Sequence, residues 1–198
     1  MKRVFDVAVA SLLLLAVAPI LAACALAVWL TSKGPAIFGH KRYGRGGTTF
    51  NCLKLRTMVA HAEAWLEEDE DLRVLHKQND FKLPLAKDPR VTRIGRFLRV
   101  SHIDELPQLI NVLRGEMSLV GPRPVVGEEL EWYGDRAGDL LAARPGIFGL
   151  WTVQGHRRVE YPARVSVELE YVGNSSFMGD VSILLQHVPV LLRGQGEE

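Results

Sequence analysis

The sequence predicts a mostly helical α+β protein with an N-terminal membrane segment, and three observations lead to this fold class. Residues Val7–Leu30 contain no charged side chain. Two short runs typical of strands flank a glycine turn at Gly44–Gly47, and apolar residues recur at helical spacing in later segments. We therefore expect a membrane segment at residues 1–33 and one domain at residues 34–198 that contains a small β-hairpin.

The composition argues against several classes of protein. The 198 residues carry a formal net charge of +1, so no overall field indicates a nucleic-acid-binding protein. The two cysteines, Cys24 and Cys52, argue against a disulfide framework and fit a reducing compartment. The six histidines are scattered without a pair at metal-ligand spacing, so no zinc site is expected.

The apolar run Val7–Leu30 admits three interpretations. At about 1.5 Å per residue it is long enough for a straight transmembrane helix. Lys2 and Arg3, with the later box Leu21–Cys24, also resemble a secretory signal of lipoprotein type, although the apolar run continues further than such signals usually do. The third interpretation is a re-entrant hairpin that returns to the side from which it entered.

Pro19 lies near the middle of the apolar run and predicts a bend. Proline cannot donate a backbone hydrogen bond to the carbonyl of Leu15, and its ring presses on that turn. Basic residues stand on both flanks of the run, namely Lys2, Arg3, Lys33, Lys41, Arg42 and Arg45. Because basic flanks favour the cytoplasmic side, a hairpin bent at Pro19 keeps both flanks there, whereas a straight span exports one. The residues alone leave all three interpretations open.

The chain after residue 34 is predicted to form two strands, a helix and a loop, at Ala36–Tyr43, Thr48–Arg56, Met58–Lys77 and Phe81–Pro89. In the second strand Lys54 and Arg56 share one face. Arginines then recur at every third position, at Arg90, Arg93, Arg96 and Arg99. In a helix this spacing gives either a solvated face or a strip that binds phosphate groups, because guanidinium forks match phosphate oxygens in pairs.

Asp104 and Glu105 stand at the predicted start of a short helix. Apolar residues follow at helical spacing, Pro107 suits a first turn, and Gly115 suits a helix end. Asp104 could serve simply as an N-cap, worth about 1 kcal/mol. The same position also stabilises an ionised carboxylate and attracts phosphate. Asp104 would then be a competent nucleophile toward phosphorus, and Glu105 could bind a metal ion or a proton.

Arg123 stands between two prolines in the segment Gly121–Pro124. Both prolines restrict the backbone beside it, so the arginine is held with little freedom. This segment is either a rigid surface turn or a pre-positioned phosphate clamp, of the kind that phosphoryl transfer requires.

Taken together, these residues resemble the bacterial sugar transferase family, the monotopic polyprenyl-phosphate phosphoglycosyl transferases. The similarity extends over nearly the whole chain. It is carried by Lys2-Arg3 with Asp6, Gly34-Pro35, Lys54–Met58, Asp88–Arg99, Asp104–Leu109, Asn111–Leu113, Gly115–Pro124, Arg144–Gly146 and Gly149–Trp151.

The resemblance implies transfer of a sugar 1-phosphate from a UDP-sugar to polyprenyl (undecaprenyl) phosphate, with release of UMP. It implies that Asp104 forms a covalent phospho-sugar intermediate and that Glu105 and Mg²⁺ assist, with both carboxylates as metal ligands. The residues that it assigns to substrate phosphates are Lys54, Arg56, Arg90, Arg99, Arg123 and Arg144.

The resemblance also favours the re-entrant hairpin, with the bend at Ala18-Pro19. It implies a catalytic domain with membrane-surface helices on the cytoplasmic face of the bacterial inner membrane. The reaction would be the first membrane step in the assembly of exopolysaccharide, O-antigen or glycoconjugate. The expected partners are the two substrates and the bilayer, with no nucleic acid, and a homodimer is compatible with them. Two alternatives are a non-catalytic assembly or regulatory protein on the same scaffold and an exported lipoprotein acylated at Cys24.

Several positions depart from the family pattern. Ala18 replaces a serine that is common before the proline, and His102 replaces a serine two residues before Asp104. The other departures cluster after residue 145, at Phe148, Thr152, His156 and Glu168. The segment around Trp151 is closer to members that transfer a hexose phosphate, so we expect hexose 1-phosphate rather than an acetamido sugar phosphate.

Overall fold

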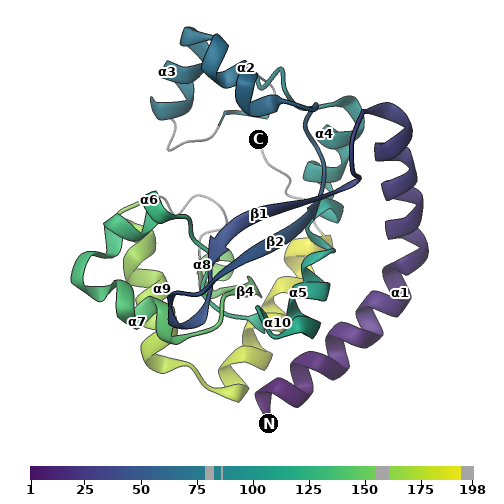
Figure 1. Cartoon of the computed structure of the whole chain (residues 1–198). Helices are drawn as coiled ribbons and strands as arrows, with labels where there is room; N and C mark the ends of the chain where they lie inside the picture. The colour runs from purple at the N-terminus through teal and green to yellow at the C-terminus, as the bar shows by residue number, and fades with distance from the viewer. Residues whose placement is uncertain (79–82, 86, 155–160, 193–198) are drawn as a thin grey trace. The chain divides into compact units, whose positions relative to one another are not determined.

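The computed structural model describes residues 1–78, 83–85, 87–154 and 161–192 (Figure 1). These residues form two compact units. Unit 1 contains Met1–Ala18, Gly39–Leu53 and the described chain from Pro107 onward, and unit 2 contains Pro19–Phe38 and the described part of Lys54–Leu106. The described chain is mostly helical with short strands, as the sequence predicted.

The α-helices are α1 Lys2–Thr31, α2 Ala62–Glu68, α3 Glu70–Gln78, α4 Arg93–Val100, α5 Gln108–Arg114, α6 Gly127–Leu130, α7 Ala137–Ala142, α8 Leu150–Gln154, α9 Ala163–Asn174 and α10 Phe177–Leu192. In the described residues, 3₁₀ turns occur at η1 Arg45–Gly47, η2 Ile103–Glu105 and η3 Glu131–Arg136. The strands are β1 Ile37–Tyr43, β2 Thr49–Leu55, β3 Ser118–Val120 and β4 Gly146–Phe148.

The predicted β-hairpin is confirmed, and β1 and β2 pair with each other (Figure 1). Gly46 and Gly47 in the connection have φ of +69° and +77°, which glycine adopts without steric cost. A second sheet was not predicted: β3 and β4 pair in parallel, with Ser118 opposite Gly146 and Val120 opposite Phe148.

The prediction of a single helix over Met58–Lys77 is wrong. Met58 forms an isolated bridge with Val91, and two helices, α2 and α3, follow in place of one. The helices are interrupted at Asp69, whose backbone is extended. The Asp69 carboxylate accepts a hydrogen bond from the Leu72 N–H at 3.0 Å, so this residue caps the start of α3. A local aspartate cap therefore interrupts the apolar periodicity.

The helix predicted to start at or just before Asp104 begins later. Asp104 lies in the 3₁₀ turn η2, and α5 starts at Gln108 with Pro107 as its N-cap residue. Asp104 is therefore not the N-cap of α5. The predicted end is confirmed, because Gly115 caps α5 with a φ of +83°.

Each unit has its own apolar core. The centre of unit 1 contains Ala10, Phe50, Cys52, Leu109, Val112, Met117, Leu119, Val120, Tyr171 and Ile183. A second cluster in unit 1 contains Val125, Tyr133, Leu140 and Leu169. The core of unit 2 is formed by Val28, Leu55 and Leu98.

In the described part of the chain, α1 is the one helix that is long and apolar enough to cross a membrane. Much of its apolar surface is exposed; Leu12 and Leu15, for example, are 69% and 74% exposed. An apolar surface of this extent is typical of contact with lipid. Pro19 lies inside α1, and the boundary between the two units falls between Ala18 and Pro19. The bend itself stays a prediction.

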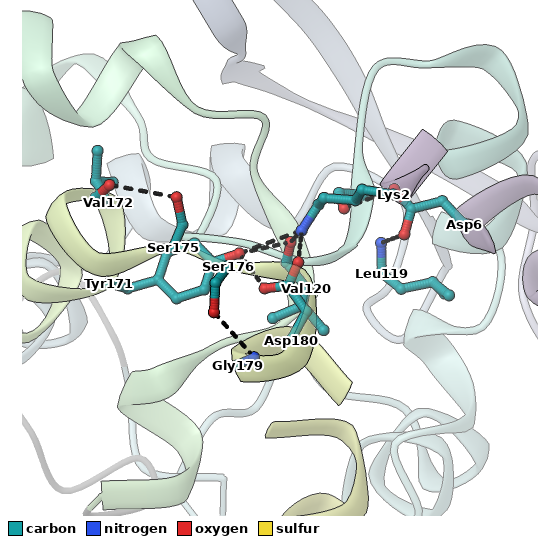
Figure 2. Close-up of polar contacts among 11 residues, drawn as sticks. Lys2, Asp6, Leu119, Val120, Tyr171, Val172, Ser175, Ser176, Gly179 and Asp180 are labelled. Atoms are coloured by element: carbon teal, nitrogen blue, oxygen red, sulfur yellow. Dashed lines mark hydrogen bonds and ion pairs between the residues drawn. The ribbon is translucent and has the colours of Figure 1, made fainter. Parts of the chain in front are cut away.

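The first turns of α1 are fixed to the body of unit 1 by charged side chains (Figure 2). Lys2 donates to the carbonyl of Val120 at 2.8 Å and forms an ion pair with the buried carboxylate of Asp180. Asp180 also accepts a hydrogen bond from the Tyr171 hydroxyl at 2.7 Å. Asp6 accepts hydrogen bonds from the Ser118 hydroxyl at 2.8 Å and from the Leu119 N–H. The N-terminal end of the apolar helix therefore belongs to the folded domain.

Candidate active site

The acidic pair of unit 2 is presented by a tight turn between α4 and η2. His102 adopts a left-handed conformation, with a φ of +58°, which is unusual for a residue other than glycine. Its carbonyl accepts a hydrogen bond from the Glu105 N–H at 3.2 Å. This reversal leaves Asp104 buried, with 6% of its surface exposed, and Glu105 only partly buried.

Lys54, which the sequence assigned to substrate phosphates, forms an ion pair with Glu105 that was not predicted. The ammonium of Lys54 lies 2.7 Å from Oε1 of Glu105, although the two residues are 51 positions apart. Both side chains are 33% exposed, so the pair adds less than about 1 kcal/mol to stability. Its consequence is positional: a cation is held beside the acidic pair.

Helix α4 is attached to the end of β2 at Thr57. The carbonyl of Thr57 accepts a hydrogen bond from the Thr92 N–H, and the Thr92 hydroxyl caps α4 by accepting from the Gly95 N–H at 2.9 Å. A Cβ atom on Gly95 would lie 1.9 Å from the Thr57 carbonyl oxygen, so only glycine fits there. Arg99 donates from Nε to the Thr57 hydroxyl at 2.9 Å.

Two other predicted phosphate-binding residues of unit 2 have structural partners. Arg56 donates to the carbonyl and the hydroxyl of Ser32 at 2.8 and 2.9 Å, which satisfies acceptors just beyond the end of α1. Arg90 precedes α4 and binds the Asp88 carboxylate through two parallel hydrogen bonds, both of 2.8 Å. Burial alone would raise the pKa of Asp88, but the hydrogen bonds and charge of Arg90 hold it below its ordinary value.

Arg123 and Arg144 belong to unit 1, where the turn Gly121–Val125 is held on several sides. The carbonyls of Pro122 and Val125 accept hydrogen bonds from the N–H groups of Gly146 and Tyr43 at 2.8 and 2.9 Å. The guanidinium of Arg42 donates to the Pro124 carbonyl at 3.3 Å. The rigidity expected for this turn therefore comes from β1 and β4 as well as from its prolines.

A buried polar cluster surrounds Arg123. Its backbone N–H donates to both oxygens of Glu168 at 3.3 Å. The guanidinium carbon of Arg123 lies 5.7 Å from the centroid of the Trp151 ring, and that of Arg164 lies 5.0 Å from the same centroid. Arg164 was not identified from the sequence. The available signal was its spacing from Glu168, since residues at i and i+4 share one face of a helix.

Glu168 is fully buried in this cluster. Burial raises the pKa of Glu168 from its ordinary 4.5 to about 7, although the Arg123 N–H and the charges of Arg164 and Arg123 oppose this rise. Burial also lowers the pKa of Arg164, and the charge of Arg123 lowers it further. The cluster therefore combines two arginines with a carboxyl that is partly neutral near pH 7.

Arg144 lies at the end of α5. It donates from Nε to the Gly115 carbonyl at 3.0 Å, so it satisfies a helix terminus. It also lines an open groove of about 320 Å³ together with Arg45, Thr48, Thr49 and Glu116.

Two of the departures from the family pattern contact the same buried histidine. The hydroxyl of Thr152 hydrogen-bonds to Nε2 of His187, and the ring of Phe148 lies 4.9 Å from the His187 ring. Thr152 and Phe148 are therefore neighbours in space. His156 lies outside the described residues.

Asp104 and Glu105 are the candidate metal ligands. Carboxylate oxygens suit Mg²⁺, which is commonly held by one or two carboxylates and completed by substrate phosphate oxygens and water. Within the described ranges, no group of three or more His, Cys, Asp or Glu side chains could form a complete metal cage. The acidic pair fits an ion that is shared with a substrate.

The chain matches the bacterial sugar transferase family over residues 1–194. It belongs to this family. The resemblance predicted from the sequence is thus confirmed.

Curated relatives support the assignment. An uncharacterized sugar transferase of Haemophilus influenzae is 46% identical over 99% of this chain. The undecaprenyl-phosphate galactose phosphotransferase of Salmonella typhimurium is 42% identical over 99% of the chain. The chain spans 42% and 41% of the lengths of these two proteins. The exopolysaccharide production protein ExoY of Sinorhizobium fredii is 41% identical, and the aligned region covers 98% of this chain and 87% of that protein.

Proposed function

We propose that this sugar transferase moves a sugar 1-phosphate from a UDP-sugar to undecaprenyl phosphate and releases UMP. Family membership carries the proposal, together with relatives named for undecaprenyl-phosphate galactose and glucose transfer. The paired Lys54 and Glu105 beside Asp104, and the apolar helix α1, supply the matching chemistry for an anionic donor and a lipid acceptor.

The proposed reaction has two displacements at phosphorus. A carboxylate oxygen of Asp104 attacks the β-phosphorus of the UDP-sugar, and the bond from that phosphorus to the bridging oxygen breaks. UMP leaves with the bridging oxygen, and the sugar phosphate stays on Asp104 as an acyl phosphate. A phosphate oxygen of undecaprenyl phosphate then attacks the same phosphorus and regenerates the Asp104 carboxylate.

The other charged groups proposed for the site hold the reacting groups in position and neutralise phosphate charge. The Lys54 ammonium holds Glu105 in place, and we expect Arg99 and Arg123 to bind substrate phosphates. Mg²⁺ held by Asp104 and Glu105 would neutralise phosphate charge as the leaving group departs.

A hexose is the proposed sugar. The relatives with a named sugar transfer galactose or glucose, and the Caulobacter vibrioides enzyme, a UDP-glucose:undecaprenyl-phosphate glucose-1-phosphate transferase, is 44% identical over 96% of this chain. The proposed role is the first membrane step of exopolysaccharide or related glycan assembly, at the cytoplasmic face of the inner membrane.

The connectivity of the chain supports a re-entrant α1. Lys2 and Asp6 fix the start of α1 to residues 118–180 of unit 1. Residues 32–38 alone connect the end of α1 to Gly39, which is again in unit 1. The eight residue steps from Thr31 to Gly39 span at most about 29 Å, which is less than a hydrocarbon core of about 30 Å. This limit supports the proposal that both ends of α1 lie on one side of the bilayer, with the bend at Pro19.

UMP release tests the proposal. Purified protein with undecaprenyl phosphate and Mg²⁺ is offered UDP-glucose, UDP-galactose and UDP-acetamido sugars in turn. We expect UMP from one hexose donor, dependent on lipid and metal. Asp104→Asn should abolish release and the covalent phospho-sugar adduct seen by mass spectrometry, whereas Asp71→Asn on the exposed helix α3 should not. Turnover by Asp104→Asn would refute the nucleophile assignment, and a well-folded, inactive wild type would favour a non-catalytic role.

A further inference from the structure

Two buried guanidinium nitrogens in unit 1, Nε of Arg123 and Nε of Arg164, lack hydrogen-bond partners among the described residues. The buried hydroxyls of Tyr133 and Tyr161 lie beside them and interact with each other. Buried polar groups are satisfied in the great majority of native proteins, so the two Nε atoms are candidates to bind a ligand. The two tyrosines adjoin each other, with ring centroids 6.2 Å apart, and the guanidinium of Arg164 lies 5.6 Å from the Tyr161 centroid. These atoms therefore belong to one cluster.

The described residues do not balance the charge of this cluster. Arg164 is 3% exposed, and neither Arg123 nor Arg164 forms an ion pair within the described chain. Glu129 is already paired with Arg42 at 3.0 Å and also accepts a hydrogen bond from the Val126 N–H. A buried cation and a half-buried cation that share one carboxyl are costly unless an anion joins them.

The geometry also leaves guanidinium N–H groups of Arg123 and Arg164 available to bind an anion. Both guanidinium carbons lie over the Trp151 ring, which is a favourable contact for arginine. This contact does not use the guanidinium N–H groups, which are the groups that bind an oxyanion in pairs. A water molecule could satisfy the Nε atoms, but it would not neutralise the two charges.

We propose that Arg123 and Arg164 form one binding site for a phosphate group, with Trp151 as its support. The choice of phosphate as the oxyanion rests on the proposed function, whereas the pair of arginines rests on the structure alone. Arg164 is then a binding residue that works with Arg123, and Glu168 is the carboxyl that opposes the bound anion.

Glu168 gives this site a distinctive pH dependence. The groups that interact with it are Arg123, Arg164, Glu129 from α6, Tyr133 from η3 and Tyr171 from α9. With a pKa of about 7, roughly a tenth of Glu168 is protonated at pH 8. If the anion binds when this carboxyl is neutral, the wild type should bind about tenfold more weakly at pH 8 than at pH 6.

The first experiment measures sulfate binding to the full-length protein in detergent. Sulfate keeps its charge over this pH range, and sodium chloride of equal ionic strength is the reference. The readouts are tryptophan fluorescence and the melting temperature, and the saturable part of each response reports the site. Arg164→Gln should weaken binding about tenfold or more, whereas Arg136→Gln, on an exposed ion pair of the same unit, should not.

Glu168→Gln provides a second test that does not depend on the folding of the Arg164 variant. We expect it to bind sulfate like the wild type at pH 6 and about tenfold more tightly at pH 8. The inference is overturned if the wild type shows no saturable response, if Arg164→Gln responds like the wild type, or if Glu168→Gln keeps the wild-type pH dependence.

Competition identifies the source of the phosphate. Displacement of sulfate by UDP indicates the nucleotide donor, and displacement by undecaprenyl phosphate indicates the lipid acceptor. UMP release separates the two proposals. Turnover without Arg164-dependent sulfate binding refutes this site and leaves the transferase assignment intact. Arg164-dependent sulfate binding without turnover refutes the transferase assignment and leaves this site intact.

Discussion

Replacing Glu168 with glutamine should change how the stability of the protein depends on pH. The folded protein raises the pKa of Glu168 from 4.5 to about 7 because the carboxyl is fully buried. Between these two values the folded state binds more protons at this position than the unfolded state. The stability that the neutral carboxyl contributes is therefore fully present below pH 4.5 and is lost as the pH rises to about 7.

The size of this effect follows from the shift in pKa. One pKa unit corresponds to about 1.4 kcal/mol, so the wild type should lose about 3 kcal/mol of unfolding free energy from this residue between pH 4.5 and pH 8. In a protein of this size that loss lowers the melting temperature by about 6 to 12 °C. Glu168→Gln removes the titration, so it should melt above the wild type at pH 8 and close to it at pH 5.

The assay is thermal unfolding in detergent, in sulfate-free and phosphate-free buffers, at several pH values from 5 to 8. Glu170→Gln is the matched control, since Glu170 lies on the same helix and is exposed. Only the difference between each variant and the wild type is interpreted, which cancels the titration of other groups. Parallel pH curves for Glu168→Gln and the wild type would show that the carboxyl is not held neutral, and the reasoning would fail.

Three further variants test how the candidate site is built. Asn111→Ala should destabilise the protein by about 3 kcal/mol in chemical unfolding. The reason is that the buried Asn111 amide accepts a hydrogen bond from the Leu53 N–H at 2.9 Å and donates one to the Asn51 carbonyl at 2.8 Å. A loss of stability below about 1 kcal/mol would contradict this. Lys54→Met should lower kcat/KM for UMP release at least about tenfold with little change in melting temperature, since both side chains of its ion pair are one-third exposed. Unchanged kinetics would remove Lys54 from the site. Arg90→Gln should cost about 3 kcal/mol of stability by leaving the Asp88 carboxylate buried without its cation, and the double variant with Asp88→Asn should recover part of that loss.

The parts of the fold that could be predicted from the sequence are those with local signals. The glycine turn gave the β1–β2 hairpin, and Gly115 gave the end of α5. The parallel pair β3 and β4 was missed because each strand has only three residues and their register depends on a distant partner. The break between α2 and α3 was missed because the Asp69 cap competes with an apolar periodicity that continues on both sides.

The residues of the candidate site also differ in whether the sequence contains a local signal for them. Asp104 and Glu105 could be proposed from the sequence because adjacent carboxylates in a recognisable segment are a local feature. Arg164 and Glu168 were missed because charged residues on a helix are usually exposed, and only packing shows that both are buried.

The arginines show why residue type alone cannot assign a phosphate-binding role. A guanidinium binds phosphate through its N–H edges, and carbonyls at helix ends and buried carboxylates compete for the same edges. Arg56 donates from Nη2 to Ser32 just beyond the end of α1, Arg144 donates from Nε to the Gly115 carbonyl, and Arg90 binds Asp88 through the edge formed by Nε and Nη2. Arg56 also has an Nε without a partner, but Arg123 differs because its backbone N–H is held by Glu168 while none of its guanidinium nitrogens donates a hydrogen bond within the described chain. A rigid backbone and an unused guanidinium edge are the combination that a phosphate site requires, and sequence spacing reports neither.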